Sequence, residues 1–169
     1  MDIGAIYFTR LATREELNLR AVIVGPGDQR LYRELADKLG ISNKVLFTGF
    51  VDEDTKIGAI DASIALVLPS LSNYVEAYSL AITEAWAREK PVIASATGEI
   101  PYRVKHMING LVVPPRDPKA LAEAIKILIQ DRRLGEKLGE IGKSGVITWS
   151  NVVDMLLKIY GEVFNASKG

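Results

Sequence analysis

Short apolar runs recur along the chain, and most are separated from the next by a longer segment whose apolar residues have helical spacing. The runs are AVIVG at 21–25, KVLFT at 44–48, IALVL at 64–68, PVIA at 91–94 and LVV at 111–113. Their apolar residues are consecutive rather than alternating with polar ones, which is typical of strands buried on both faces of a parallel sheet. We therefore predict five parallel strands.

The segments between and after these runs predict helices. In the first, Leu31, Leu35 and Leu39 share one face of a helix. A later segment begins with Asp117-Pro118, a capping residue followed by proline in the first turn. The predicted helices cover 31–39, 52–60, 80–88, 118–129, 132–144 and 150–164. This alternation predicts an α/β fold, with a Rossmann-like parallel sheet and helices on both faces.

Ligands of such folds bind beyond the carboxyl ends of the strands, so the loops to search are 25–27, 49–51, 69–79 and 94–98. Gly25 and Gly27 in the first loop let the backbone turn tightly and approach a ligand closely. The full dinucleotide fingerprint G-x-G-x-x-G is absent, because position 30 is arginine. A plain strand-to-helix turn is therefore an alternative interpretation of this loop.

The composition excludes several kinds of site. The chain of 169 residues has no cysteine, which rules out disulfides, thiolate metal sites and cysteine nucleophiles. A single histidine, His106, rules out a His-rich metal site, and we interpret it as structural or exposed. The formal net charge is zero, so the chain as a whole does not attract nucleic acid or an anionic membrane. No run of 18 apolar residues is present to span a membrane, and the start lacks the pattern of a signal peptide.

The length is that of one domain. We assign residues 21–164 to this domain, 1–20 to an atypical N-terminal segment of it and 165–169 to a frayed tail. Trp86 and Trp149 lie in helical segments, and we predict that both belong to the core.

The segment VEAYSLAITEAWA, residues 75–87, carries two glutamates eight positions apart, Glu76 and Glu84. On one helix that spacing corresponds to about 80° of rotation and roughly 12 Å of rise, too far for both to act on one bond. The helix is predicted to begin near Ser79, and its free N–H groups would attract phosphate. A phosphate pair bound there would have a carboxylate on either side, which suits a nucleotide-sugar. The alternative is that Glu76 is a solvated loop acid and Glu84 a surface residue.

Five segments in order resemble the C-terminal, donor-binding domain of the retaining GT-B glycosyltransferases, in the family 4-like group that includes glycogen synthase, sucrose synthase and bacterial mannosyltransferases. They are AVIVGPGD, KVLFTGFVDED, VLPSLSNYVEAYSLAITEAWAREKPVIASATGEIP, NGLVVPPRDPKALAEAI and TWSNVVDMLLKIYGEVF. Together they lie between Ala21 and Phe164, and the central one carries the E-x7-E signature of this group.

The resemblance implies roles for individual residues. Glu84 would bind the ribose hydroxyls, and Glu76 would be the catalytic residue that faces the transferred sugar. The other implied donor-binding positions are the backbone amides of Tyr78, Ser79 and Leu80 on the diphosphate, Phe50 and Val51 near the base, Gly25 and Gly27, and Arg10 and Arg14 on the leaving diphosphate. Two such cations would stabilise the departing charge. The resemblance therefore implies no metal ion and no cofactor besides the nucleotide-diphosphate sugar substrate.

The chain departs from the family pattern at several positions. Ala77 and Ser79 replace the two glycines of Glu-Gly-Phe-Gly. In the usual Gly-Gly-x-Pro-Glu, Glu99 replaces the second glycine and Tyr102 the glutamate. The connection from Arg10 to the first predicted strand is also shorter than in the family. These departures concern the phosphate loop and the sugar pocket.

The implied function is the donor half of a hexosyltransferase, whose acceptor is held by a separate N-terminal domain not present in this sequence. The chain alone is expected to be inactive, as a fragment, a separate subunit or a degenerate copy. The alternatives are a non-catalytic nucleotide-sugar-binding or scaffolding module, and an epimerase of the same architecture, which would need a catalytic histidine. The implied location is cytoplasmic, with peripheral membrane contact of a full-length enzyme left open. The helix at 150–164 would lie near the domain junction, so an exposed apolar patch is expected there.

Overall fold

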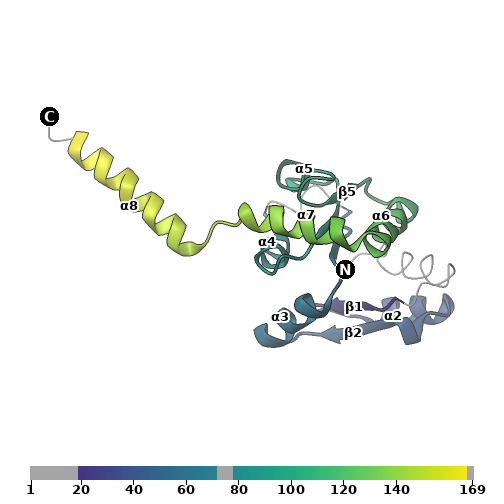
Figure 1. The fold of residues 1–169 in the computed structure, drawn as a ribbon. Coiled ribbons are helices and arrows are strands. Elements are labelled where there is room, and N and C mark those ends of the chain that lie inside the picture. The colour runs from purple at the N-terminus through teal and green to yellow at the C-terminus, as the bar shows by residue number, and fades with distance from the viewer. Residues whose placement is uncertain (1–18, 72–77, 167–169) are drawn as a thin grey trace.

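A computed structural model describes residues 19–71 and 78–166, and Figure 1 shows its arrangement of strands and helices. The strands are β1 (Ala21–Val24), β2 (Val45–Gly49), β3 (Leu66–Leu68), β4 (Val92–Ser95) and β5 (Leu111–Val113). The helices are α2 (Arg30–Lys38), α3 (Glu53–Ala62), α4 (Leu80–Ala87), α5 (Ile100–Arg103), α6 (Pro118–Gln130), α7 (Arg132–Ser144) and α8 (Trp149–Ala166), with a 3-10 turn at Ser42–Lys44. The predicted α/β fold is confirmed. The ends of each predicted strand differ from those of the observed strand by at most two residues.

All strand pairings between these elements are parallel, as predicted. In the described residues they form two hydrogen-bonded groups: β1 pairs with β2, and β4 lies between β3 and β5. Two ion pairs from side chains of α3 to α4 and its C-cap residue, described below, join the part of the molecule around β1–β2 to the part around β3–β4–β5.

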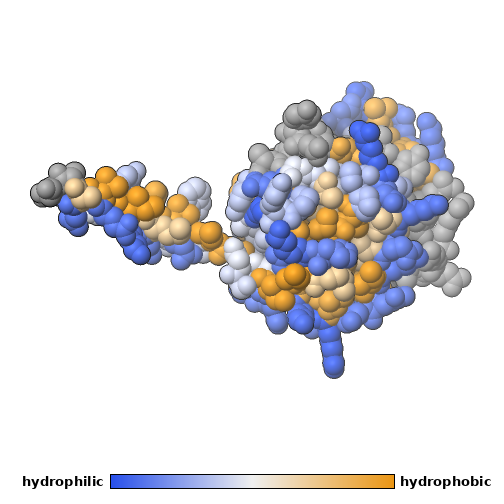
Figure 2. Space-filling view, turned by 90° about the horizontal axis from the view of Figure 1, so that it is seen from above, coloured by the Kyte–Doolittle hydropathy of each residue, from blue (hydrophilic) through white to orange (hydrophobic). Residues whose placement is uncertain are grey.

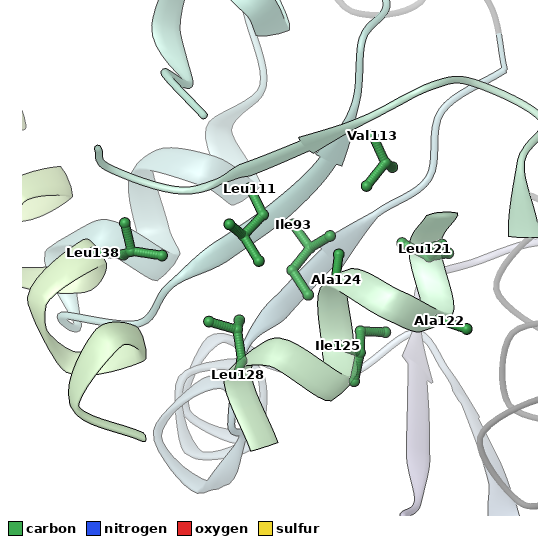
Figure 3. Packing of buried hydrophobic residues seen from close by; sticks show 9 residues of the cluster. All are labelled: Ile93, Leu111, Val113, Leu121, Ala122, Ala124, Ile125, Leu128 and Leu138. Atoms are coloured by element: carbon green, nitrogen blue, oxygen red, sulfur yellow. The ribbon is translucent and has the colours of Figure 1, made fainter. Parts of the chain in front are cut away.

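The three-stranded sheet is covered by helices on both faces. Side chains alternate along β4, so that Ile93 faces α6 and α7, whereas Val92 and Ala94 face α4 and α5. Figure 3 shows Ile93 and Leu111 directed toward the apolar side chains of α6, with Leu138 of α7 beside them. Every residue of β4 is buried, which confirms the interpretation of this apolar run as a strand buried on both faces.

The two-stranded sheet differs from this prediction. One face packs against α2 through Val45 and Phe47, but side chains on the other face are exposed. Val22 and Leu46 on that face are 51% and 59% exposed. The prediction that these strands are buried on both faces is therefore wrong, because among the described elements a helix packs against only one of their two alternating sets of side chains.

Helix α7 crosses α4 at two buried glycines. A Cβ atom on Gly142 would lie 2.1 Å from the ring of Trp86, and one on Gly139 would lie 2.0 Å from the carbonyl oxygen of Glu89. Trp86 is buried in this contact, and its indole N–H donates to the carbonyl of Asn109 at 3.0 Å. The prediction that Trp86 belongs to the core is confirmed.

Helix α8 projects away from the rest of the molecule (Figure 1), and none of its described residues is buried. Trp149 is 84% exposed, so its prediction as a core residue is wrong: helical spacing alone does not show whether a helix has a neighbour. The helix continues to Ala166, so Asn165 is helical rather than part of a frayed tail. Figure 2 shows apolar side chains along α8, as expected for the patch at 150–164; those exposed include Val153, Met155, Leu157, Ile159, Tyr160, Val163 and Phe164. Among the helices within 19–71 and 78–166, none combines the length and apolarity that crossing a membrane requires.

Candidate functional site

The start of α4 follows the carboxyl end of β3, where the sequence predicts phosphate binding. Ser79 is the N-cap residue, and its side chain makes no capping hydrogen bond, so it does not occupy the free amides of the first turn. Leu80 is the first residue of α4, and its side chain is exposed. The side chain of Tyr78, two residues earlier, is also exposed. Tyr78, Ser79 and Leu80 thus lie in one turn, in which Tyr78 and Leu80 are exposed and Ser79 is half-buried. Glu76, Arg10 and Arg14 lie outside the described residues.

Glu84 lies one turn inside α4 and forms an ion pair with Lys56 of α3. The distance from Lys56 Nζ to Glu84 Oε1 is 2.8 Å, and the Glu84 side chain is 37% exposed. Lys56 also contacts Glu53 at 2.9 Å. The pKa of Lys56 is raised mainly by the hydrogen bond from its ammonium group to Glu84, and to a smaller extent by the one to Glu53. A second ion pair, 2.5 Å long, joins Asp61 of α3 to Arg88, the C-cap residue of α4.

Phe50 and Val51 lie between β2 and α3. The Phe50 side chain is 83% exposed. Asp52 then caps α3 by accepting a hydrogen bond from the Thr55 amide at 2.7 Å. This cap fixes where α3 begins, and Lys56 follows in its first turns. Helix α3 thus links the loop at Phe50 and Val51, which the resemblance places near the base, to Glu84, which it places on the ribose. The link to Glu84 is the ion pair with Lys56.

The glycine loop after β1 lies beside the end of β2. Gly25 and Gly27 have φ angles of 145° and 122°, a backbone region that side-chain-bearing residues rarely adopt. The Gly25 amide donates to the Gly49 carbonyl at 3.0 Å. The predicted tight turn is therefore present, and it lies next to the loop that carries Phe50.

Arg103 and Lys56 are two residues of this region that the sequence analysis did not identify. Arg103, at the end of α5, donates to the carbonyl of Ser79 at 2.9 Å and to the hydroxyl of Thr83 at 2.8 Å. The contacts of Arg103 with Ser79 and of Lys56 with Glu84 span 24 and 28 positions of the sequence. No local motif could have indicated them.

Near the carboxyl end of β4, Ser95 and Thr97 are buried. Thr97 Oγ1 has no hydrogen-bond partner in the described part of the chain. The turn that follows contains Gly98, at a φ of 52°, and Glu99, at a φ of −85°. Only the first of these two positions needs a glycine, so the replacement of the second by Glu99 leaves the backbone of the turn unstrained.

The chain is similar to glycosyl transferases in sequence and to several solved structures in fold. A family model described as "Glycosyl transferases group 1" matches residues 7–145. A glycosyltransferase of Methanocaldococcus jannaschii, itself described as uncharacterized, is 31% identical over 150 residues, which are 86% of this chain and 38% of that protein. The chain therefore spans well under half the length of this relative.

Solved structures agree in fold. Sucrose-phosphate synthase from Thermosynechococcus elongatus superposes with a TM-score of 0.79 at 28% identity, covering 95% of this chain and 42% of that one. HepE from Anabaena, solved in complex with UDP, gives a TM-score of 0.77 at 24% identity, covering 95% of this chain and 44% of that one. The latter likeness is one of fold.

Proposed function

Because the chain belongs to the family of group 1 glycosyl transferases, we propose that it is the donor-binding half of a retaining glycosyltransferase of the GT-B fold. It would bind a nucleotide-diphosphate sugar and present its hexosyl group to an acceptor held by a separate domain. The sugar-nucleotide complex of HepE with UDP-glucose supports a donor of this class. The extent of the match supports the two-domain arrangement, since the chain covers 38% and 42% of two longer relatives.

The observation that carries this proposal is the position of Glu84. Its carboxylate lies on α4 four residues after Leu80, which is about 6 Å along the helix axis. Lys56 holds one carboxylate oxygen from α3 at 2.8 Å. A carboxylate has about four acceptor sites, so Oε2 and the remaining lone pair of Oε1 can accept the two ribose hydroxyls.

The neighbouring elements supply contacts for the rest of the donor. The turn at Tyr78, Ser79 and Leu80 would hold the diphosphate through backbone amides and the positive end of the α4 dipole. Phe50 offers an exposed aromatic face for the base. Gly25 and Gly27, beside the Phe50 loop, would let the backbone come close to the nucleotide.

Three residues outside the described part of the chain complete the proposal through the resemblance alone. Glu76 would face the transferred sugar as the catalytic residue. Arg10 and Arg14 would contact the leaving diphosphate. Cationic side chains would then stabilise the departing charge, and we propose that the reaction needs no metal ion.

A non-catalytic binding module is the second candidate. It is favoured by the substitutions in the turn after β4, where Glu99 and Tyr102 are both exposed. Glu99 would bring a negative charge to the side of the site where the sugar is expected. Such a module would bind the nucleotide-sugar without transferring it, even when a complementary acceptor domain is supplied.

Calorimetry or ligand-observed NMR with UDP-, GDP- and ADP-sugars tests the proposal. One of the three should bind at millimolar concentration or below, and the matching nucleoside diphosphate should displace it. Failure of all three to bind at that concentration would refute the donor-binding function. Binding without transfer in the presence of an acceptor domain from a group 1 relative would favour the non-catalytic module.

A further inference from the structure

The guanidinium group of Arg103 is held against the first turn of α4 by neutral groups. It donates to the Ser79 carbonyl at 2.9 Å and to the Thr83 hydroxyl at 2.8 Å. Its central carbon lies 3.9 Å from the centre of the Tyr78 ring and 5.6 Å from that of Trp86. The four contacts fix the cation beside the residues that begin the helix.

Arg103 differs in this respect from two other arginines of the molecule. Arg30 pairs with Asp28, and Arg88 pairs with Asp61. Arg103 is half-buried, and within 19–71 and 78–166 it has no ion pair with a carboxylate. A partly desolvated charge is costly without a counter-charge, and the two aromatic rings offset only part of that cost.

The surroundings of Arg103 add to its positive potential. The amino end of α4 carries the positive end of the helix dipole, and the guanidinium contacts its first turn. The two positive centres repel one another in the free protein. A bound anion at this turn would be attracted by both and would relieve the repulsion.

We propose that Arg103 is an electrostatic determinant of diphosphate binding at the start of α4. This inference rests on the proposed function. When the sugar leaves, the bond from its anomeric carbon to the β-phosphate oxygen breaks, and the electron pair stays on the diphosphate. The acceptor hydroxyl oxygen bonds to the anomeric carbon, and its proton passes to the diphosphate. Arg103 stabilises the charge that gathers on the phosphate oxygens in this step.

The inference is tested by comparing ligands with and without phosphate on three variants of the chain. Arg103→Met removes the charge but keeps an apolar stem against the rings, whereas Arg103→Lys keeps the charge. Arg88→Met is the matched control, because Arg88 is the C-cap residue at the opposite end of the same helix. The probes are the tightest-binding of UDP, GDP and ADP, its nucleoside, and inorganic pyrophosphate as a competitor.

Arg103→Met should weaken nucleoside diphosphate and pyrophosphate binding by about tenfold and leave nucleoside affinity within about twofold, because only the phosphates carry charge. Arg103→Lys and Arg88→Met should bind the diphosphate within about threefold of the wild type. The salt dependence of diphosphate binding should become shallower only in Arg103→Met.

The inference is overturned if Arg103→Met keeps wild-type diphosphate affinity, if it loses nucleoside and diphosphate equally, or if Arg103→Lys binds as weakly as Arg103→Met. A wild type that binds no nucleotide refutes the proposed function instead. If Arg103→Met shows no cooperative thermal transition, Arg103→Gln replaces it, because glutamine retains a neutral donor for the Ser79 carbonyl. The same outcomes then apply to Arg103→Gln.

Discussion

Lys56 and Glu84 form an ion pair that joins α3 to α4, with 2.8 Å between the amino nitrogen and the carboxylate oxygen Oε1. The pair links the helix that follows the exposed Phe50 loop to the helix whose start is proposed to hold the diphosphate. It is partly exposed, so its contribution to folding is small, but it restricts where the Glu84 carboxylate can point. Its main consequence is therefore expected in ligand binding.

Replacing Lys56 by methionine tests this expectation. Lys56→Met should lower the free energy of unfolding by less than about 1 kcal/mol, as for other partly exposed ion pairs. Nucleotide affinity should fall by about threefold to tenfold, because Glu84 loses the group that fixes its orientation. Urea denaturation and calorimetric titration measure the two effects.

The control is Lys126→Met, because Lys126 forms an ion pair with Glu123 on α6 at the same distance of 2.8 Å. This variant should leave nucleotide affinity unchanged. Equal binding by the two variants would show that Lys56 has no effect on the site.

The ion pairs Lys56–Glu84 and Asp61–Arg88 are expected to lose their contributions to stability at opposite ends of the pH range. Lys56 has a raised pKa, so its contribution to stability is fully present below the pKa of an unfolded lysine, near 10.5, and is lost as the pH rises through the higher folded value. Arg88 lowers the pKa of Asp61, so that contribution is present above the usual value of 3.8 and is lost as the pH falls through the lower folded value. Thermal stability should therefore be insensitive to both pairs between about pH 5 and 9.

Asp61→Asn should flatten only the acid limb of a plot of melting temperature against pH, and Lys56→Met only the alkaline limb. The plots are measured by circular dichroism in buffers of constant ionic strength. An Asp61→Asn plot with the wild-type acid limb would show that the Asp61–Arg88 pair does not contribute there.

The α4–α7 contact predicts which glycines accept a side chain. Gly139→Ala would place its Cβ atom 2.0 Å from the Glu89 carbonyl oxygen, a backbone atom rather than the end of a flexible side chain. We expect a loss of about 1 to 3 kcal/mol in unfolding free energy, the usual range for overpacking. Gly58 lies within α3 and has no atom within 4 Å of such a Cβ.

Gly58→Ala should therefore stabilise the chain by roughly 0.5–1 kcal/mol, the difference between glycine and alanine inside a helix. Urea denaturation of both variants gives the comparison. A Gly139→Ala variant as stable as the wild type would mean that α7 does not pack as closely on α4 as the structure shows.

The elements of the fold could be predicted from the sequence because their signals are local. The cap at Asp117 is one example: its carboxylate accepts hydrogen bonds from the amides of Lys119 and Ala120 at 3.0 and 2.9 Å. The residues 21–24, 45–49 and 92–95 likewise appear as apolar runs whatever surrounds them. Such patterns need no knowledge of distant contacts.

The surroundings of these elements could not be predicted in the same way. An apolar face shows that a residue can be buried, but Trp149 and Val22 are exposed because no described element packs against them. The contacts of Glu84 with Lys56 and of Arg103 with Ser79 span 28 and 24 positions. They depend on how α3, α4 and α5 meet, which the spacing of residues in one segment does not encode.

The central claim is that Glu84 binds the ribose of a nucleotide-sugar, and a thermodynamic cycle tests it most directly. Calorimetry would compare the tightest-binding nucleoside diphosphate with its 2′,3′-dideoxy analogue on the wild type, on Glu84→Gln and on the control Glu123→Gln. Loss of the hydroxyls should weaken binding to the wild type and the control by about 10- to 100-fold, the range for hydrogen bonds to a charged group. Glu84→Gln should bind both ligands within about threefold of each other, because the charged acceptor is gone. If Glu84→Gln distinguishes the two ligands as strongly as the wild type does, Glu84 does not bind the ribose.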